Sequence, residues 1–164
     1  QLDSPVALRY PRGSGIGDRK VKISPIVEMG RSEILRRGDD VVIFAAGPIV
    51  YNCLEVAELL AQEGIQSSVV NIRFIKPLDE ELIVNLARKT KVVVTLEEHL
   101  LAGGFGSAVL EVLNKAGIMV HTLRIGLPDK FIEHGNANLL RKIYKLDVEG
   151  IREKIWEFWS SLHK

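Results

Sequence analysis

Short apolar runs alternate with amphipathic segments along most of the chain. Four runs have the length of β-strands and are bounded by polar or glycine-containing stretches: VVIFAA (41–46), SSVVNIRF (67–74), KVVVTLEE (91–98) and IMVHTLRIG (118–126). Runs such as VVIFAA are apolar at every position rather than at every second one. Such a pattern predicts strands that are buried on both faces, as in a parallel sheet covered by helices.

The segments between these runs have the 3.6-residue spacing of amphipathic helices. Helices are predicted at 49–63, at 80–89 after Pro77, in the segment after GGFG, at 136–144 and at 148–162. In the first helix Val50, Leu54, Ala57 and Ala61 are expected to form the buried stripe. Asp79 is the expected N-cap of the second helix, because a short polar side chain there can accept a backbone N–H bond.

The order strand, helix, strand predicts an α/β domain with an open, mostly parallel sheet and helices on both faces. Two strands around the turn at 38–40, within residues 30–47, predict an antiparallel edge hairpin. The run PVALRY (5–10) predicts a further strand. We therefore expect two parts: residues 1–24 form an N-terminal strand and linker leading in from a preceding domain, and residues 25–164 form the α/β domain.

Composition narrows the class of protein. The chain has 164 residues, of which 46% are hydrophobic and 26% charged, which is typical of one soluble globular domain. Its 22 basic and 21 acidic residues give a net charge of +1, and this balance argues against nucleic-acid binding. No apolar run approaches the roughly 18 residues that a membrane span needs. With one cysteine and no signal-like segment, a cytoplasmic location and no membrane contact are expected.

A glycine cluster, EEHLLAGGFGSA (97–108), follows a predicted strand and opens a predicted helix. Free N–H groups at such a helix start can bind an anion. Glu97 and Glu98 would place like charge beside that anion, so close packing of helix on strand is the favoured interpretation, although the sequence leaves both open. Adjacent strand residues point to opposite faces, so these glutamates are not expected to form a catalytic pair.

Other reactive side chains are scattered. The four histidines lie in different predicted elements, without the short spacing of zinc ligands: His99, His121, His134 and His163. Cys53 falls in the middle of a helix and is expected to be a buried small hydrophobe. Ser107 lacks the strand–turn context of a nucleophile elbow. No catalytic residue and no metal ligand are predicted on this chain.

The opening stretch PVALRYPRGSGIGDR concentrates positive charge, with Arg9, Arg12 and Arg19 around three glycines. No helix follows GSGIG, so the dinucleotide-binding interpretation fails. Arginine nevertheless suits phosphate, because its guanidinium is planar and permanently charged. On a strand Arg9 would face a cleft while Tyr10 packs on the other side. A phosphate contact and a solvated basic loop both remain open at this point.

Four motifs occur together in a recognisable order and spacing: VALRYPRGSGIG (6–17), RFIKPLD (73–79), TLEEHLLAGGFGS (95–107) and GLPDKFIEHG (126–135). They resemble the C-terminal domain of the 1-deoxy-D-xylulose-5-phosphate synthase family, which is transketolase-like and depends on thiamine diphosphate. The resemblance extends from Pro5 to about Ile155. RFIKPLD and the glycine loop are shared with transketolases and with 2-oxoacid dehydrogenase β subunits, whereas RYPRG and GLPDKFIEHG point to the synthases.

The resemblance implies a transferase reaction in which pyruvate and glyceraldehyde 3-phosphate give 1-deoxyxylulose 5-phosphate and CO2 for isoprenoid and thiamine biosynthesis. It implies that thiamine diphosphate and Mg2+ are bound by the preceding pyrophosphate and pyrimidine domains, and that the complete enzyme is a homodimer. Arg9 is the implied contact to the acceptor's phosphate, and Arg12 is a second candidate. The isolated chain is expected to be inactive.

Three alternatives stay open. The chain could be the C-terminal subunit of a split transketolase, a 2-oxoacid dehydrogenase β subunit, or a stand-alone module for anion binding or dimerisation. The last alternative could use the stretch IWEFWSSL (155–162), with Trp156 and Trp159 three residues apart. Packing of that stretch on the domain's own sheet is the favoured interpretation, because one helical stripe needs burial.

Overall fold

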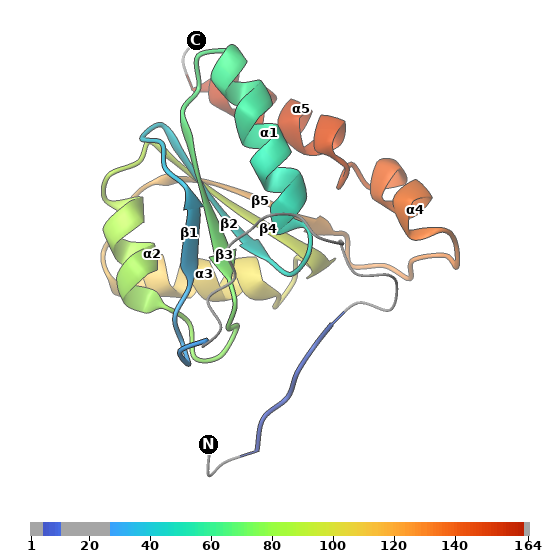
Figure 1. Cartoon of the computed structure of the whole chain (residues 1–164), viewed down its shortest axis with the longest axis horizontal. Coiled ribbons are helices and arrows are strands. Elements are labelled where there is room, and N and C mark those ends of the chain that lie inside the picture. Colours follow the sequence, from blue (N-terminus) through green and yellow to red (C-terminus); the bar gives the residue numbers. More distant parts are fainter. Residues whose placement is uncertain (1–4, 11–26, 163–164) are drawn as a thin grey trace.

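A five-stranded sheet forms the centre of the chain (Figure 1), in a computed structural model that describes residues 5–10 and 27–162. The strands are β1 (Glu33–Arg36), β2 (Val41–Ala46), β3 (Ser67–Ile72), β4 (Val92–Leu100) and β5 (His121–Leu127). The helices are α1 (Val50–Gln62), α2 (Glu80–Ala87), α3 (Phe105–Lys115), α4 (Ala137–Ile143) and α5 (Val148–Ser161).

The strand order is β1-β3-β2-β4-β5; the strands β2 to β5 run parallel to one another, and β1 at the edge pairs antiparallel with β3. The predicted α/β class, with a mostly parallel sheet and one antiparallel edge, is confirmed. β2 lies in the middle of the sheet because nearly all of its residues are apolar and buried. Such a strand stabilises the fold most where helices cover both of its faces.

The predicted hairpin is wrong, because β1 pairs with β3 and not with β2, and Ile34 lies opposite Val70. The turn at 38–40 instead carries the chain across the start of β3. There the Gly38 N–H donates to the Ser68 hydroxyl over 2.9 Å, and that hydroxyl donates to the Gly38 carbonyl over 2.7 Å. Turn residues determine where a chain reverses. Which neighbour each flanking strand pairs with depends on how its apolar side chains are buried.

Helices cover both faces of the sheet (Figure 1). One core lies between the sheet and the helices α1 and α5, and the other lies between the sheet and the helices α2 and α3. The buried stripe of α1 is Val50, Cys53, Val56, Ala57 and Leu60. The prediction was right for Val50 and Ala57 and wrong for Leu54 and Ala61, which are half-buried. α1 packs against α5 as well as against the sheet, and Cys53, Val56 and Leu60 are buried in addition to the predicted positions.

The predicted strand at 5–10 is also wrong. These residues form no strand, and they extend away from the sheet (Figure 1). Leu8 and Tyr10 are 84% and 82% exposed. β-prone side chains make a strand only where the backbone finds a pairing edge, and this segment pairs with none of the described strands. The proposed boundary at residue 25 lies outside the described residues and stays a prediction.

The two closing helices form as predicted. Asp147 caps α5 by accepting the Gly150 N–H over 3.3 Å. Trp159 packs against the core on the α1 side, and the Lys91 ammonium lies 5.3 Å from its ring centroid. Trp156 is 45% exposed. The stretch IWEFWSSL therefore packs mainly on its own domain.

None of the helices in the described part of the chain is long and apolar enough to cross a bilayer.

Candidate functional site

The carboxyl ends of the parallel strands meet along one edge of the sheet. In open α/β folds this edge is where ligands bind. Most of the candidate residues that the structure describes gather here: Glu97 and Glu98 near the end of β4, Gly104 and Gly106 at the start of α3, and Arg9 from the N-terminal segment. Arg12 lies outside the described residues, so its role stays a prediction.

Glu97 is a buried carboxylate, only 2% exposed, that points toward α3. Its two oxygens accept the backbone N–H groups of Phe105 over 2.7 Å and of Gly106 over 2.8 Å. The first N–H groups of a helix lack partners within the helix, and the helix dipole favours a negative charge beside them. The anion position at the glycine cluster is therefore filled by the chain's own side chain.

The glycines of the cluster are needed for this approach. A Cβ built on Gly106 would lie 2.5 Å from the Thr95 hydroxyl oxygen and 3.0 Å from Arg124 Nε. A Cβ on Gly104 would overlap the Glu97 carboxylate. Close packing of helix on strand, the favoured interpretation from the sequence, is thus confirmed, and Glu97 is the group that the glycines accommodate.

Arg124 of β5 completes this cluster. Its terminal guanidinium nitrogen Nη2 donates to the Leu101 carbonyl and, over 2.9 Å, to the Ser107 hydroxyl. The Ser107 hydroxyl in turn donates to the Leu101 carbonyl over 3.1 Å. Arg124 Nε and the Thr95 hydroxyl are buried without a hydrogen-bond partner among the described residues. Ser107 is therefore held in a structural network. Sequence reasoning missed Arg124, although a single cation in the otherwise uncharged strand HTLRIGL was a usable signal.

Glu98 points to the opposite face of the sheet, as the alternation of strand side chains predicts. Its carboxylate accepts Arg141 Nε of α4 over 2.6 Å, and Arg141 Nη1 donates to the Asn138 side chain over 3.2 Å. The side chains of Glu98 and Arg141 are 26% and 29% exposed. The two adjacent glutamates thus bind different helices, and the prediction that they point to opposite faces of the sheet is confirmed.

Arg9 reaches the same strand end from the N-terminal segment. Its Nη2 donates to the backbone carbonyl oxygen of Glu98 over 3.1 Å, and its side chain is exposed. A guanidinium has five N–H donors, and this bond uses one of them. Since Glu98 and Arg141 neutralise each other, Arg9 adds a net positive charge at the carboxyl edge of the sheet.

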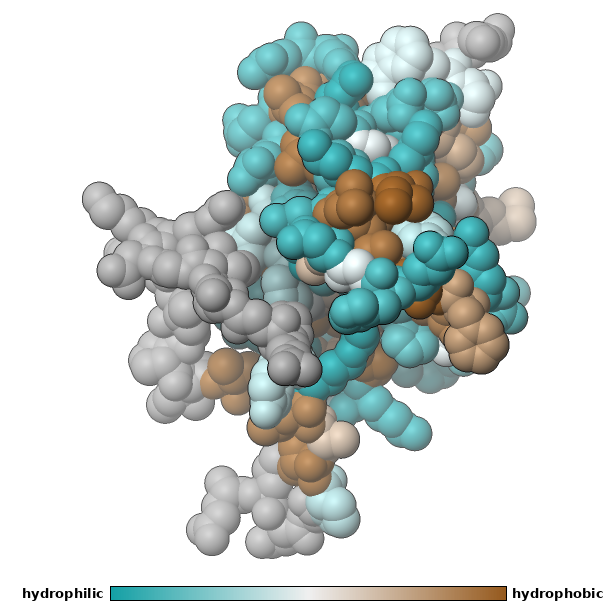
Figure 2. Space-filling view, turned by 90° about the vertical axis from the view of Figure 1, so that its right-hand side faces the viewer, coloured by the Kyte–Doolittle hydropathy of each residue, from teal (hydrophilic) through white to brown (hydrophobic). Residues whose placement is uncertain are grey.

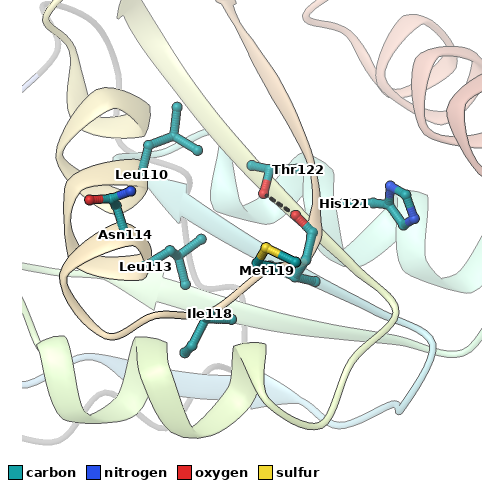
Figure 3. Close-up of a pocket in the computed structure, with 8 residues that line it drawn as sticks. Leu110, Leu113, Asn114, Ile118, Met119, His121 and Thr122 are labelled. Carbon is teal, nitrogen blue, oxygen red and sulfur yellow. Dashed lines mark hydrogen bonds between the residues drawn. The ribbon is translucent and has the colours of Figure 1, made fainter.

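A separate groove of about 640 Å³ lies between α3 and the start of β5 (Figure 3). Leu110, Leu113 and Met119 supply much of its apolar wall, and the Thr122 hydroxyl donates to the Val120 carbonyl over 3.1 Å. The lining contains no lysine, arginine or carboxylate. The groove therefore does not suit a phosphate, and it lies at the amino end of β5, away from Arg9.

The described residues do not fit a thiamine diphosphate–Mg2+ site of their own. Among them there is no group of three or more histidine, cysteine or acidic side chains that could hold a metal ion. The helix start that could receive a diphosphate is filled by Glu97. Cys53 is fully buried, and burial raises the pKa of its thiol, so it is not a nucleophile in the folded chain.

Comparison with known proteins adds an independent observation. Residues 30–151 match the family described as "Transketolase, C-terminal domain". The chain is 48% identical over 151 residues to 1-deoxy-D-xylulose-5-phosphate synthase from Heliobacterium modesticaldum, covering 92% of this chain and 23% of that protein. It is 50% identical over 153 residues to the synthase from Desulforudis audaxviator, covering 91% and 24%. The chain thus spans about a quarter of the length of these relatives.

Solved structures share the fold. A protein described as a split gene transketolase, inactive beta4 tetramer, superposes with a TM-score of 0.75 at 37% identity, covering 84% of this chain and 45% of that chain. The transketolase of Campylobacter jejuni superposes with a TM-score of 0.59 at 17% identity, covering 78% of this chain and 18% of that chain. The second likeness concerns the fold alone.

Proposed function

The chain belongs to the transketolase C-terminal domain family, and from this premise we propose that it is the C-terminal domain of a 1-deoxy-D-xylulose-5-phosphate synthase. The observation that carries the proposal is its identity of 44–50% to synthases over more than nine-tenths of its length. In the proposed reaction a two-carbon unit from pyruvate joins glyceraldehyde 3-phosphate with release of CO2, which supplies an isoprenoid precursor.

Within that enzyme the chain's own contribution is a cation for the acceptor. Arg9 carries a permanent charge whose planar fork can bind two phosphate oxygens at once. Its bond to the Glu98 carbonyl keeps the guanidinium at the carboxyl edge of the sheet. The neighbouring Arg141 is neutralised by Glu98, so Arg9 is the cation that we assign to the phosphate. Arg12 stays a second candidate.

The cofactors and the catalytic groups belong to other parts of the enzyme in this proposal. The described residues fit neither thiamine diphosphate nor Mg2+, which supports assigning both to the remaining three-quarters of the synthase. Purified alone, the 164-residue chain should not convert pyruvate and glyceraldehyde 3-phosphate, even with thiamine diphosphate and Mg2+ supplied. Detectable product from the chain alone would contradict this assignment.

The face around α4 supports contact with those other parts. α4 has no buried residue, and apolar side chains reach the surface over it (Figure 2). Leu139 and Ile143 are 56% and 61% exposed, and Phe131 in the preceding loop is fully exposed. Burial of such side chains is worth about 25 cal/mol per Å². We place the contact with the preceding domains here, in a complete enzyme that is a homodimer.

A split transketolase is the second candidate, because the structure with a TM-score of 0.75 and 37% identity is described as a split gene transketolase. Both enzymes would use a phosphate-binding arginine, so Arg9 does not separate them. The donor substrate does. A complete enzyme that consumes pyruvate but not ketose phosphates is a synthase, whereas the reverse preference identifies a transketolase.

The decisive experiment compares native and Arg9→Ala forms of the complete enzyme. kcat/KM is measured with glyceraldehyde 3-phosphate and with unphosphorylated glyceraldehyde. Loss of a charge-assisted phosphate contact should cost roughly 2–4 kcal/mol with the phosphorylated acceptor only. Arg152→Ala is the matched control, because Arg152 pairs with Glu63 over 2.6 Å at the end of α1, away from this edge. Equal losses for both acceptors, or none, would refute the phosphate role of Arg9.

A further inference from the structure

We propose that Glu97 is a positioning residue for Arg9, acting through the backbone carbonyl of Glu98; this inference rests on the proposed phosphate role of Arg9. The carboxylate of Glu97 anchors the end of β4 to the start of α3. The carbonyl of the next residue holds the Arg9 guanidinium. The buried anion would thus set the position of the exposed cation.

The end of β4 needs such an anchor because its regular pairing stops there. Pairing with β2 ends at Glu97, opposite Ala46. Pairing with β5 is interrupted between Leu96 and Leu100. The Glu98 carbonyl lies inside this interruption, where the parallel ladder does not determine its orientation. Side-chain contacts must therefore fix the peptide to which Arg9 is bound.

Two contacts do so, one on each face of the sheet. Toward α3, the Glu97 carboxylate is almost fully buried and accepts two backbone N–H groups. Toward α4, the Glu98 carboxylate pairs with Arg141 over 2.6 Å, with both side chains about a quarter exposed. Charged acceptors in buried sites make stronger hydrogen bonds than exposed pairs. Glu97 is therefore the principal anchor and the pair of Glu98 with Arg141 the weaker one.

The anchor depends on both oxygens of Glu97. In Glu97→Gln the side chain keeps its size, but its amide NH2 must face the N–H of Phe105 or of Gly106. Two donors facing each other in a buried site repel, so the side chain moves and the β4 end moves with it. Glu111→Gln, on the exposed side of α3, makes the same chemical change without touching the anchor.

The test uses the complete enzyme and the two acceptors described for Arg9. Glu97→Gln should raise KM for glyceraldehyde 3-phosphate about tenfold and leave the constants for unphosphorylated glyceraldehyde unchanged. Arg141→Met should give the same selectivity with a smaller change. Added to Arg9→Ala, neither substitution should reduce phosphate preference further, because both act through Arg9. Glu111→Gln should match the native enzyme.

The outcomes separate this inference from the proposed function. If Arg9→Ala does not lower kcat/KM selectively for the phosphorylated acceptor, the phosphate role fails, and the positioning role fails with it. If Arg9→Ala is selective but Glu97→Gln and Arg141→Met weaken both acceptors equally or neither, the positioning role is overturned while the phosphate role stands. Should Glu97→Gln fail to fold, Glu97→Asp replaces it, because it keeps both carboxylate oxygens and only shortens the side chain. A selective rise in KM for the phosphorylated acceptor then supports the positioning role, and an equal effect on both acceptors or none overturns it.

Discussion

Two charged stretches of this chain meet at the carboxyl edge of the sheet, and they differ in whether the chain itself pairs their polar groups. In the segment 97–106, the free N–H groups at the start of α3 are already paired with Glu97, and the site is closed. In the segment 5–10, Arg9 is exposed and makes one bond to a backbone carbonyl. The first stretch has the geometry of an anion site but holds its own anion. The second has little regular structure but keeps a charge available.

The comparison shows that a binding motif must be judged by whether the protein already fills it. A helix start with glycines can bind phosphate or a carboxylate of the same chain, and both satisfy the same N–H groups. Here burial of Glu97 makes the glycine cluster part of the fold. The functional hypothesis therefore moves to Arg9, and substitutions at the two stretches should affect different properties.

The largest effect on stability is expected for Glu97→Ala. This change leaves the buried N–H groups of Phe105 and Gly106 without an acceptor, which should lower the free energy of unfolding by about 3 kcal/mol. The neighbouring Glu98→Ala removes only a partly exposed ion pair and should cost less than about 1 kcal/mol. Urea unfolding of both variants measures the difference. Equal losses would show that Glu97 is not the principal anchor.

A smaller loss is expected for Gly106→Ala. Its Cβ would lie 2.5 Å from the Thr95 hydroxyl, and such overpacking costs about 2 kcal/mol. Gly103→Ala is the control, because Gly103 has φ +69° and no atom within 4 Å of an added Cβ. It should lose only the backbone strain of about 1 kcal/mol. Thermal unfolding compares the two, and an unchanged Tm for Gly106→Ala would contradict the close approach described for Glu97.

Arg9→Ala should hardly change stability. The side chain is exposed and makes one bond to the described residues, to the Glu98 carbonyl, so the free energy of unfolding should stay within about 0.5 kcal/mol of the native value. Urea unfolding of Arg9→Ala and of Glu97→Ala, measured in parallel, tests this contrast. A loss as large as that of Glu97→Ala would mean that the N-terminal segment is part of the fold, and the distinction between the two stretches would disappear.

The smallest effect concerns Glu153, whose side chain is 46% exposed and which contrasts with the buried Glu97. A hydrogen bond from Lys145, over 2.6 Å, lowers the pKa of Glu153 below its ordinary value of 4.5. Because the pKa is lower in the folded chain, the stabilisation is present above 4.5 and is lost as the pH falls through the folded value. Glu153→Gln should therefore lower the urea midpoint slightly at neutral pH and match the native chain in acid.

Much of the fold could be predicted because the relevant signals are local. The run VVIFAA at 41–46 has no polar position to expose, and β2 is the central strand. Asp79 accepts the N–H of Leu82 as the predicted N-cap of α2. The pairing of the strands could not be predicted from local signals, because β1 and β2 are adjacent in sequence and yet β3 pairs with both. The bonds between Gly38 and Ser68 form only once β3 lies beside the turn, so the sequence of the turn did not reveal that partner.

The candidate site divides in the same way. Side-chain alternation along a strand is a property of the backbone, so the opposite directions of Glu97 and Glu98 followed from the sequence alone, as did the need for glycine before α3. Which groups those side chains meet was decided by tertiary structure, because α3, Arg124 and Arg141 are brought to the end of β4 from other parts of the chain. Sequence spacing determines the face on which a charge lies, and only packing decides whether that charge is buried against a partner or left available to a ligand.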